Sequence, residues 1–274
     1  MFGAQVPVVW PFYPSIILAI ILCLVAYFGA CGPWRRRFPG AQPVPAGRRL
    51  AFVAALVTVY VALASPVDEL SDSYLFSVHM AQHLLLTLVL PPLLLIAIPG
   101  WMLRPAIRQY PALLTAGRWL TQPLVAFGLF NVVFTLYHVP ALYDAVLASA
   151  ALHVAAHLAF IVTGVITWWP VLSPLEELPP LAVGWQMAYL FAQTLPGQLL
   201  GALLTFSDTI LYPMYARAPR VWPKLTPLVD QQLGGLLMWV GGGTFFLLAF
   251  AWVFIHWALA NEARERRHRA LGRV

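Results

Sequence analysis

Long apolar runs recur along this chain, and they restrict its fold more than any other feature. Each run has roughly twenty residues, the length that a helix needs to cross the hydrocarbon core of a bilayer. Hydrophobic residues make up 61% of the chain and charged residues 9%, against about 25% charged residues in a soluble domain. Lipid cannot satisfy backbone amides, so such runs must be helical. The sequence therefore predicts an all-α, polytopic membrane protein.

We expect one transmembrane domain, residues 1–274, with seven transmembrane helices. Pro91-Pro92 should kink the third of these spans, and residues 140–148 should form a short interfacial helix. A long loop, residues 206–230, precedes the last span. The predicted spans lie at about 12–31, 50–65, 74–98, 121–138, 149–169, 182–205 and 231–258.

The 16 Lys and Arg residues predict the orientation of these spans. With the N-terminus outside, 13 of them lie on the inner side, as the positive-inside rule requires. Only Arg217, Arg220 and Lys224 lie outside. We therefore expect an N-terminus outside and a C-terminus inside, with residues 261–274 as a basic cytoplasmic tail. Because the basic residues set the orientation in a lipid bilayer, the net charge of +6 does not indicate nucleic acid as a partner.

Five of the seven histidines lie near the outer ends of predicted spans. His79 and His83 are four residues apart, as are His153 and His157, so the Cβ atoms of each pair lie roughly 5–6 Å apart on one helix face. His138 ends the fourth span. In the predicted orientation all five imidazoles lie in the outer half of the bilayer. Both pairs have the spacing that chelates one metal ion.

A single histidine in a membrane helix most often serves packing, but a cluster of costly polar groups marks a site. Imidazole suits copper, zinc, nickel and iron, and copper competes best by intrinsic affinity. The pattern predicts a metal or cofactor site, with a copper ion as the first choice and zinc or haem left open. His256 and His268 lie elsewhere, and no metal role is expected for them.

Five more residues are candidates for additional ligands or for orienting the imidazoles. Met80, Met214 and Met238 have thioethers that suit cuprous copper, although packing is the commoner role for each. Met80 points roughly 100° away from His79 on a helix. Asp144 and Asp230 could accept hydrogen bonds from ligating imidazoles, with helix capping as the alternative.

Several motifs taken together resemble the CtaG-type cytochrome c oxidase assembly factors. The resemblance covers about residues 50–258 and is specific through the combination of its motifs. These are His79-Met80-x-Gln82-His83 with a leucine run and Pro91-Pro92, Tyr137-His138-x-Pro140-x-x-Tyr143-Asp144, His153-x-x-x-His157, Trp168-Trp169-Pro170, and Asp230-Gln231 before Met238-Trp239.

This resemblance implies a seven-span protein of the bacterial plasma membrane that helps to mature the terminal oxidase. The five clustered histidines would form the metal site on the extracytoplasmic side, with Asp144 and Asp230 nearby. The implied partner is an apo-cytochrome c oxidase subunit, and an extracytoplasmic copper donor would supply the ion. The expected role is a non-enzymatic metallochaperone that supports metal delivery to the oxidase binuclear centre.

Two other functions compete with this one. A membrane redox protein would use the histidines to hold a haem or a two-metal centre. A copper transporter would need polar groups through the inner half of the membrane, yet Thr87 is the only polar side chain between Leu84 and Pro99. Transport is therefore the weakest of the three hypotheses.

Overall fold

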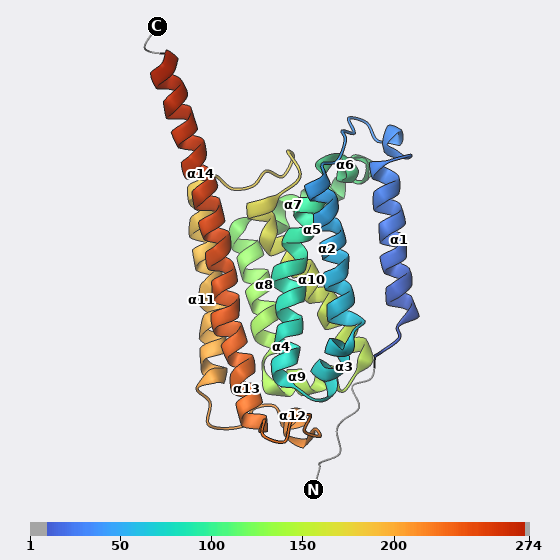
Figure 1. The fold of residues 1–274 in the computed structure, drawn as a ribbon, viewed down its shortest axis with the longest axis vertical. Helices are drawn as coiled ribbons and strands as arrows, with labels where there is room; N and C mark the ends of the chain where they lie inside the picture. The colour runs from blue at the N-terminus through green and yellow to red at the C-terminus, as the bar shows by residue number, and fades with distance from the viewer. Residues whose placement is uncertain (1–9, 272–274) are drawn as a thin grey trace.

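The computed structural model describes residues 10–271, and within that range all regular secondary structure is helical (Figure 1). The all-α prediction is therefore confirmed. The helices are α1 (Pro14–Cys31), α2 (Ala46–Leu63), α3 (Pro66–Ser73), α4 (Phe76–Leu84), α5 (Leu90–Ala97), α6 (Gly100–Gln109), α7 (Pro111–Leu120), α8 (Pro123–Tyr137), α9 (Pro140–Leu147), α10 (Ala150–Leu172), α11 (Val183–Thr205), α12 (Pro213–Arg217), α13 (Pro227–Leu236) and α14 (Gly243–Leu271). Short 3₁₀ or π segments add η1 (Arg35–Arg37), η2 (Leu85–Val89) and η3 (Leu237–Gly242).

Five helical segments of the described chain are long and apolar enough to cross a membrane. They are Pro14–Cys31, Ala46–Leu63, Phe76–Ala97, Ala150–Leu172 and Pro227–Arg269. A sixth span results if α7 and α8, which meet at a 77° bend, are counted together. The helix α11 is as long as these, but its glutamines Gln186, Gln193 and Gln198 lower its mean hydropathy. The apolar helices support a membrane protein.

Proline and short polar side chains start many of these helices. Pro14, Pro66 and Pro227 each occupy the first turn, where a missing backbone N–H costs nothing. The side chain of Ser149 accepts a hydrogen bond from the backbone of Leu152 and so caps α10. Because α10 begins there, His153 and His157 lie in its first two turns.

The third predicted span forms one continuous helical segment in which η2 joins α4 to α5. Where the prolines predicted a kink, the structure has a π-turn just ahead of Pro91 and Pro92. Proline has no N–H to donate to the carbonyl four residues earlier, which for Pro91 belongs to Thr87. The indole Nε1 of Trp168 lies 3.3 Å from that carbonyl oxygen and donates to it instead. The segment thus stays helical, and His79 and His83 keep their common face.

The C-terminal region is more helical than the sequence indicated. The last predicted span begins earlier, at Pro227, and continues through η3 into α14 as far as Leu271. The basic tail is therefore a helical extension that projects beyond the bundle (Figure 1). Residues 272–274 of the predicted tail lie outside the described residues.

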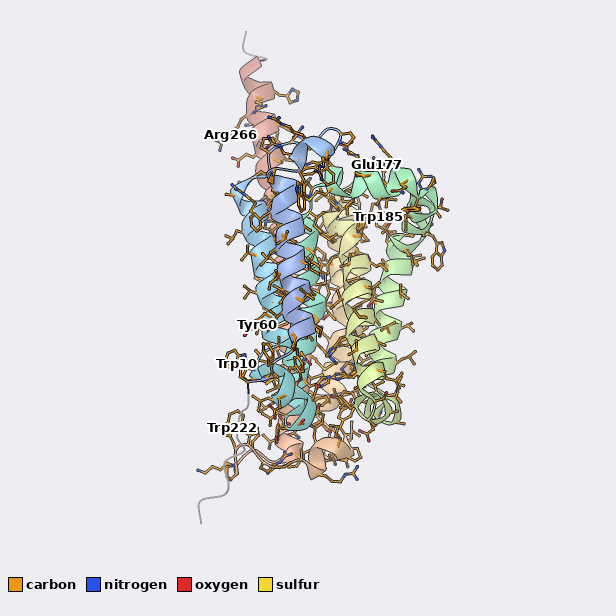
Figure 2. All side chains as sticks on the ribbon, turned by 90° about the vertical axis from the view of Figure 1, so that its right-hand side faces the viewer. Trp10, Tyr60, Glu177, Trp185, Trp222 and Arg266 are labelled. Atoms are coloured by element: carbon orange, nitrogen blue, oxygen red, sulfur yellow. The ribbon has the colours of Figure 1, made fainter. Side chains whose placement is uncertain are left out.

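The two ends of the bundle differ in their elements. The end from which α14 projects also has α6, and Figure 2 shows Glu177 and Arg266 there. The opposite end has α3, α9 and α12, and Trp222 lies at the same end. The helix α4 packs on α3 and α13, while α5 packs on α2 and α10. These contacts bring the two pairs of predicted ligands together near the end that has α3.

Candidate metal centre

The five histidines predicted as ligands are all buried, each at most 9% exposed. His79 and His83 lie on α4, His153 and His157 lie on α10, and His138 follows α8. The rings of His79 and His83 have centroids 4.3 Å apart, as do those of His153 and His157. Each pair therefore has the side-by-side geometry that its spacing predicted.

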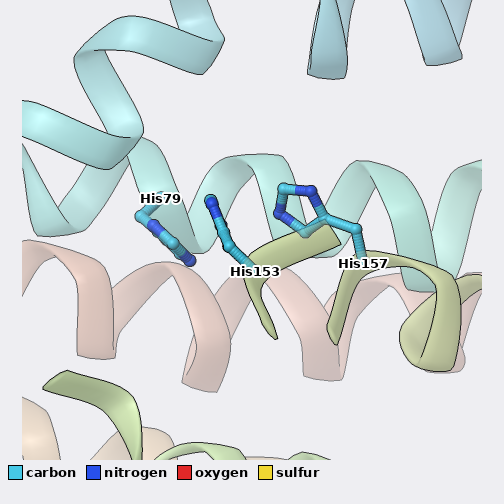
Figure 3. Close-up of side chains that lie close together, drawn as sticks. All are labelled: His79, His153 and His157. Atoms are coloured by element: carbon cyan, nitrogen blue, oxygen red, sulfur yellow. The ribbon is translucent and has the colours of Figure 1, made fainter. Parts of the chain in front are cut away.

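Four of these imidazoles form one cluster between α4 and α10. One ring nitrogen from each of His79, His153 and His157 lies within 4.8 Å of the other two, and Figure 3 shows the three rings grouped together. Nε2 of His83 lies 2.8 Å from Nε2 of His79 and so joins the group. We call these four residues the histidine cluster.

Three buried ring nitrogens of the histidine cluster have no hydrogen-bond partner among the described residues. They are Nδ1 of His83, Nε2 of His153 and Nε2 of His157. Leaving a buried polar atom unpaired costs about 1–3 kcal/mol. A metal ion bound between His79, His153 and His157 would supply the missing partners of the last two rings. The donor atoms present therefore fit a metal ion.

Asp72 on α3 orients one of these rings. Its Oδ2 lies 3.2 Å from Nδ1 of His153, and its Oδ1 lies 3.9 Å from Nδ1 of His79. Burial opposes ionisation of this carboxyl, but the hydrogen bond from His153 and the nearby imidazoles hold its pKa below the usual value. An anionic Asp72 accepts a hydrogen bond from Nδ1–H of His153. Nε2 then has a free lone pair, which is the arrangement common at metal-binding histidines.

Tyrosine hydroxyls complete the surroundings of His79. The Tyr215 hydroxyl lies 3.0 Å from His79 Nδ1 and donates to the carbonyl of Ser71 at 2.6 Å. Burial raises the pKa of Tyr215 well above its usual value, so the phenol stays protonated. The Tyr137 hydroxyl lies 3.1 Å from His79 Nε2, and that of Tyr143 lies 2.9 Å from that of Tyr215. Sequence analysis did not assign a site role to any of these tyrosines or to Asp72.

His138 lies beside the cluster and has a different neighbour. Its ring centroid is 6.1 Å from that of His83. Its Nδ1 lies 2.7 Å from the carbonyl oxygen of Phe134, and its Nε2 lies 3.3 Å from Sδ of Met80. The structure therefore separates the five histidines into the cluster of four and His138, which contacts Met80 instead.

The other candidates lie apart from the ring nitrogens of the cluster. Met238 is buried in the apolar core that also contains Met80. Met214 and Asp144 line an open surface pocket of about 490 Å³, next to Arg217. Asp230 is fully buried, and its carboxylate accepts hydrogen bonds from the first two backbone N–H groups of α4 at 2.8 and 3.2 Å. Asp230 therefore positions the helix that has His79 and His83.

A pocket of about 430 Å³ leads to the histidine cluster between α1, α3 and α10. Its lining includes Asp68, Asp72, His153 and His157. Burial raises the pKa of Asp68 from 3.8 to about 6, and its Oδ1 accepts a hydrogen bond from Gln82. Acidic groups thus line the opening through which a cation would reach the imidazoles.

Comparison with known families gives one match that covers most of the chain. The family model described as cytochrome c oxidase caa3 assembly factor matches residues 25–260. This range includes all five histidines, Met80 and Asp72.

Curated relatives occur in mycobacteria. Uncharacterised proteins of Mycobacterium bovis and Mycobacterium tuberculosis are each 26% identical to this chain, over 97% of its length and 42% of theirs. An uncharacterised protein of Mycobacterium leprae is 25% identical, over 95% of the chain and 41% of that relative. The chain thus spans about two fifths of the length of these relatives. No solved structure matches it.

Proposed function

Because this chain belongs to the cytochrome c oxidase caa3 assembly factor family, we propose that it binds copper at the histidine cluster and supports copper delivery to the oxidase binuclear centre. The proposed role is non-enzymatic, with copper as the cargo. Its partners would be an apo-oxidase subunit in the membrane and an extracytoplasmic donor of copper.

The observation that supports copper binding most directly is the set of unpartnered ring nitrogens. Those of His83, His153 and His157 are buried and lack hydrogen-bond partners among the described residues. Neutral imidazoles suit copper better than hard cations such as magnesium, and copper leads the divalent metals in affinity for such sites. Both cysteines lie on α1 rather than at the cluster, so an ion held by imidazoles can be exchanged with a partner.

We further propose seven spans in the bacterial plasma membrane, with the N-terminus and the histidine cluster on the extracytoplasmic side. In this proposal α8 and α11 are the two further spans beside the five candidates of the described chain, and they pack on α10 and α14 respectively. The uneven distribution of Lys and Arg between the two sides supports this orientation. The pocket between α1, α3 and α10 would receive copper near the outer surface.

Metal analysis of the purified chain in detergent tests this function. The double variant His153→Ala/His157→Ala removes two unpartnered nitrogens that line the pocket. We expect it to lose most of the copper that the wild type retains after desalting. His256→Ala is the matched control, because His256 is an exposed histidine in the middle of α14. Equal copper in the double variant and the wild type would contradict the proposal.

A cellular assay tests delivery separately from binding. In a strain that depends on this chain for its caa3-type oxidase, the double variant should leave the oxidase short of copper, and excess copper in the medium should partly restore it. Normal oxidase in cells with the double variant would show that the cluster does not serve delivery.

A further inference from the structure

Met80 and His138 form a contact that the histidine cluster does not explain. Successive residues of a helix point about 100° apart, so Met80 leaves α4 on a different side from His79. Its sulfur lies 3.3 Å from Nε2 of His138, the residue that follows α8. Both side chains are buried, Met80 completely. A thioether and an imidazole therefore meet away from water.

The hydrogen on His138 is placed by its other contact. Nδ1 lies 2.7 Å from the carbonyl oxygen of Phe134, which can only accept, so Nδ1 has the hydrogen. A buried imidazole favours its neutral form, which has a single N–H, because charge is costly to desolvate. Nε2 then has no hydrogen, and its lone pair faces the lone pairs of the Met80 sulfur. No hydrogen lies between the two atoms, and the contact is not a hydrogen bond.

The surroundings hold the two donors in this arrangement. The Tyr212 hydroxyl donates to the backbone carbonyl of His138 at 2.9 Å, and the imidazole packs on the Phe134 ring with centroids 4.6 Å apart. On the other side, Gly234 leaves room for Met80, because a Cβ at this glycine would lie 3.2 Å from the Met80 Cγ. Side chains held in place by their neighbours in this way are pre-organised to bind a metal ion.

We propose that Met80 Sδ and His138 Nε2 bind a cuprous ion at a second site, distinct from the histidine cluster. Thioether sulfur with imidazole is a soft donor set that favours Cu(I) over zinc and over Cu(II). This inference rests on the proposed function, since copper must be the cargo. The cluster, with nitrogen donors alone, accepts either oxidation state of copper, whereas the second site selects Cu(I).

His83 lies between the two sites. Its ring centroid is 4.3 Å from that of His79 and 6.1 Å from that of His138, and its Nδ1 has no partner among the described residues. The ring is therefore placed to ligate an ion on either side.

X-ray absorption at the copper edge tests the second site in the purified full chain in detergent, loaded with Cu(I) under anaerobic conditions. Wild-type protein should show a sulfur neighbour of copper, and Met80→Leu should lose it. Met80→Leu should also retain about one cuprous ion fewer per chain in competition with a Cu(I) chelator, with Cu(II) loading unchanged. Met187→Leu, in a separate apolar cluster, is the matched control and should keep both signals.

The outcomes separate this inference from the proposed function. If Cu(I)-loaded wild type shows nitrogen neighbours alone and copper is lost in His153→Ala/His157→Ala, the cluster stands and the second site is wrong. A sulfur neighbour that persists in Met80→Leu also overturns the second site. Wild type that retains no copper contradicts both. A wild-type spectrum without a sulfur neighbour overturns the second site whether or not Met80→Leu folds, and copper retained at the histidine cluster of Met80→Leu shows that this variant is folded.

Discussion

Asp72 and His153 are joined across two helices by a contact of 3.2 Å between a carboxylate oxygen and Nδ1. This contact directs the Nε2 lone pair of His153 toward the other imidazoles of the cluster. Loss of a carboxylate that orients a ligating histidine typically lowers metal affinity about 10–100-fold. We therefore expect Asp72→Ala to weaken copper binding by about that factor, and Asp72→Asn, which keeps an acceptor oxygen, to weaken it less. Competition with a chromophoric chelator measures both. Asp208→Ala, at an exposed position, should bind like the wild type. Unchanged affinity in Asp72→Ala would refute the orienting role.

The hydroxyl of Tyr215 links α12 to Ser71 and His79. Tyr215→Phe removes this hydroxyl and keeps the ring, so it should cost about 1 kcal/mol of folding stability. Thermal unfolding in detergent should show a lower midpoint. Tyr110→Phe, at a residue 56% exposed, is the control and should leave the midpoint unchanged. A midpoint for Tyr215→Phe equal to that of the wild type would mean that the hydroxyl contributes no net stability.

Asp230 secures the start of α4. Asp230→Ala leaves the backbone N–H groups of Phe76 and Ser77 without their acceptor in a buried place, at a cost of about 3 kcal/mol. We expect a large fall in the unfolding midpoint, together with weaker copper binding because His79 and His83 lie on the same helix. The unfolding midpoint of Asp230→Asn should lie between those of the wild type and Asp230→Ala. If Asp230→Ala bound copper as tightly as the wild type, α4 would not need this cap to present its ligands.

Two glycines of α11 provide a matched pair. A Cβ at Gly201 would lie 2.6 Å from the backbone nitrogen of Trp239, whereas a Cβ at Gly197 would meet no atom within 4 Å. Gly201→Ala should therefore destabilise the protein by roughly 1–3 kcal/mol through overpacking. Gly197→Ala should stabilise it slightly, since alanine is a better helix former by about 1 kcal/mol. Unfolding midpoints of the two variants compare them directly, and equal shifts would contradict the close approach of α11 and η3.

Asp68 gives the stability of the protein a pH dependence. Its pKa is about 6 in the folded protein and 3.8 in the reference state, so folding favours the protonated carboxyl. The folded state binds the extra proton between these pH values, and this contribution to stability is lost as the pH rises through about 6. Asp68→Asn keeps an acceptor for Gln82 without the charge. It should unfold at a higher temperature than the wild type above pH 6, and the advantage should shrink toward pH 4. An advantage independent of pH would contradict this assignment.

The helices and the histidine pairs were accessible from the sequence because both depend on local periodicity. Apolar runs predict helices, and a spacing of four residues places His79 beside His83 without knowledge of the fold. The prolines predicted a kink in the third span, and the π-turn that precedes them was not predicted. A π-turn depends on which carbonyl finds another donor, and that donor is Trp168, a residue of another helix.

The partners of the imidazoles depend on tertiary packing, so local patterns did not reveal them. Asp72 looks like any acidic residue of a polar turn until α3 folds against α4 and α10. Asp230 was a candidate for orienting an imidazole, yet its oxygens face the start of α4. The separation of His138 from the cluster depends on how α8 is rotated toward Met80, which residue spacing does not reveal.

The cap that Asp230 provides for α4 also relates the folding of this helix to the order of synthesis. Phe76 is synthesised 154 residues before Asp230, so the first turn of α4 has no carboxylate acceptor until α13 has been made. A nascent chain truncated before Asp230 has already synthesised every histidine of the cluster but lacks this tether. The first turn of the helix that presents His79 and His83 therefore gains its carboxylate cap only after α13 has been synthesised.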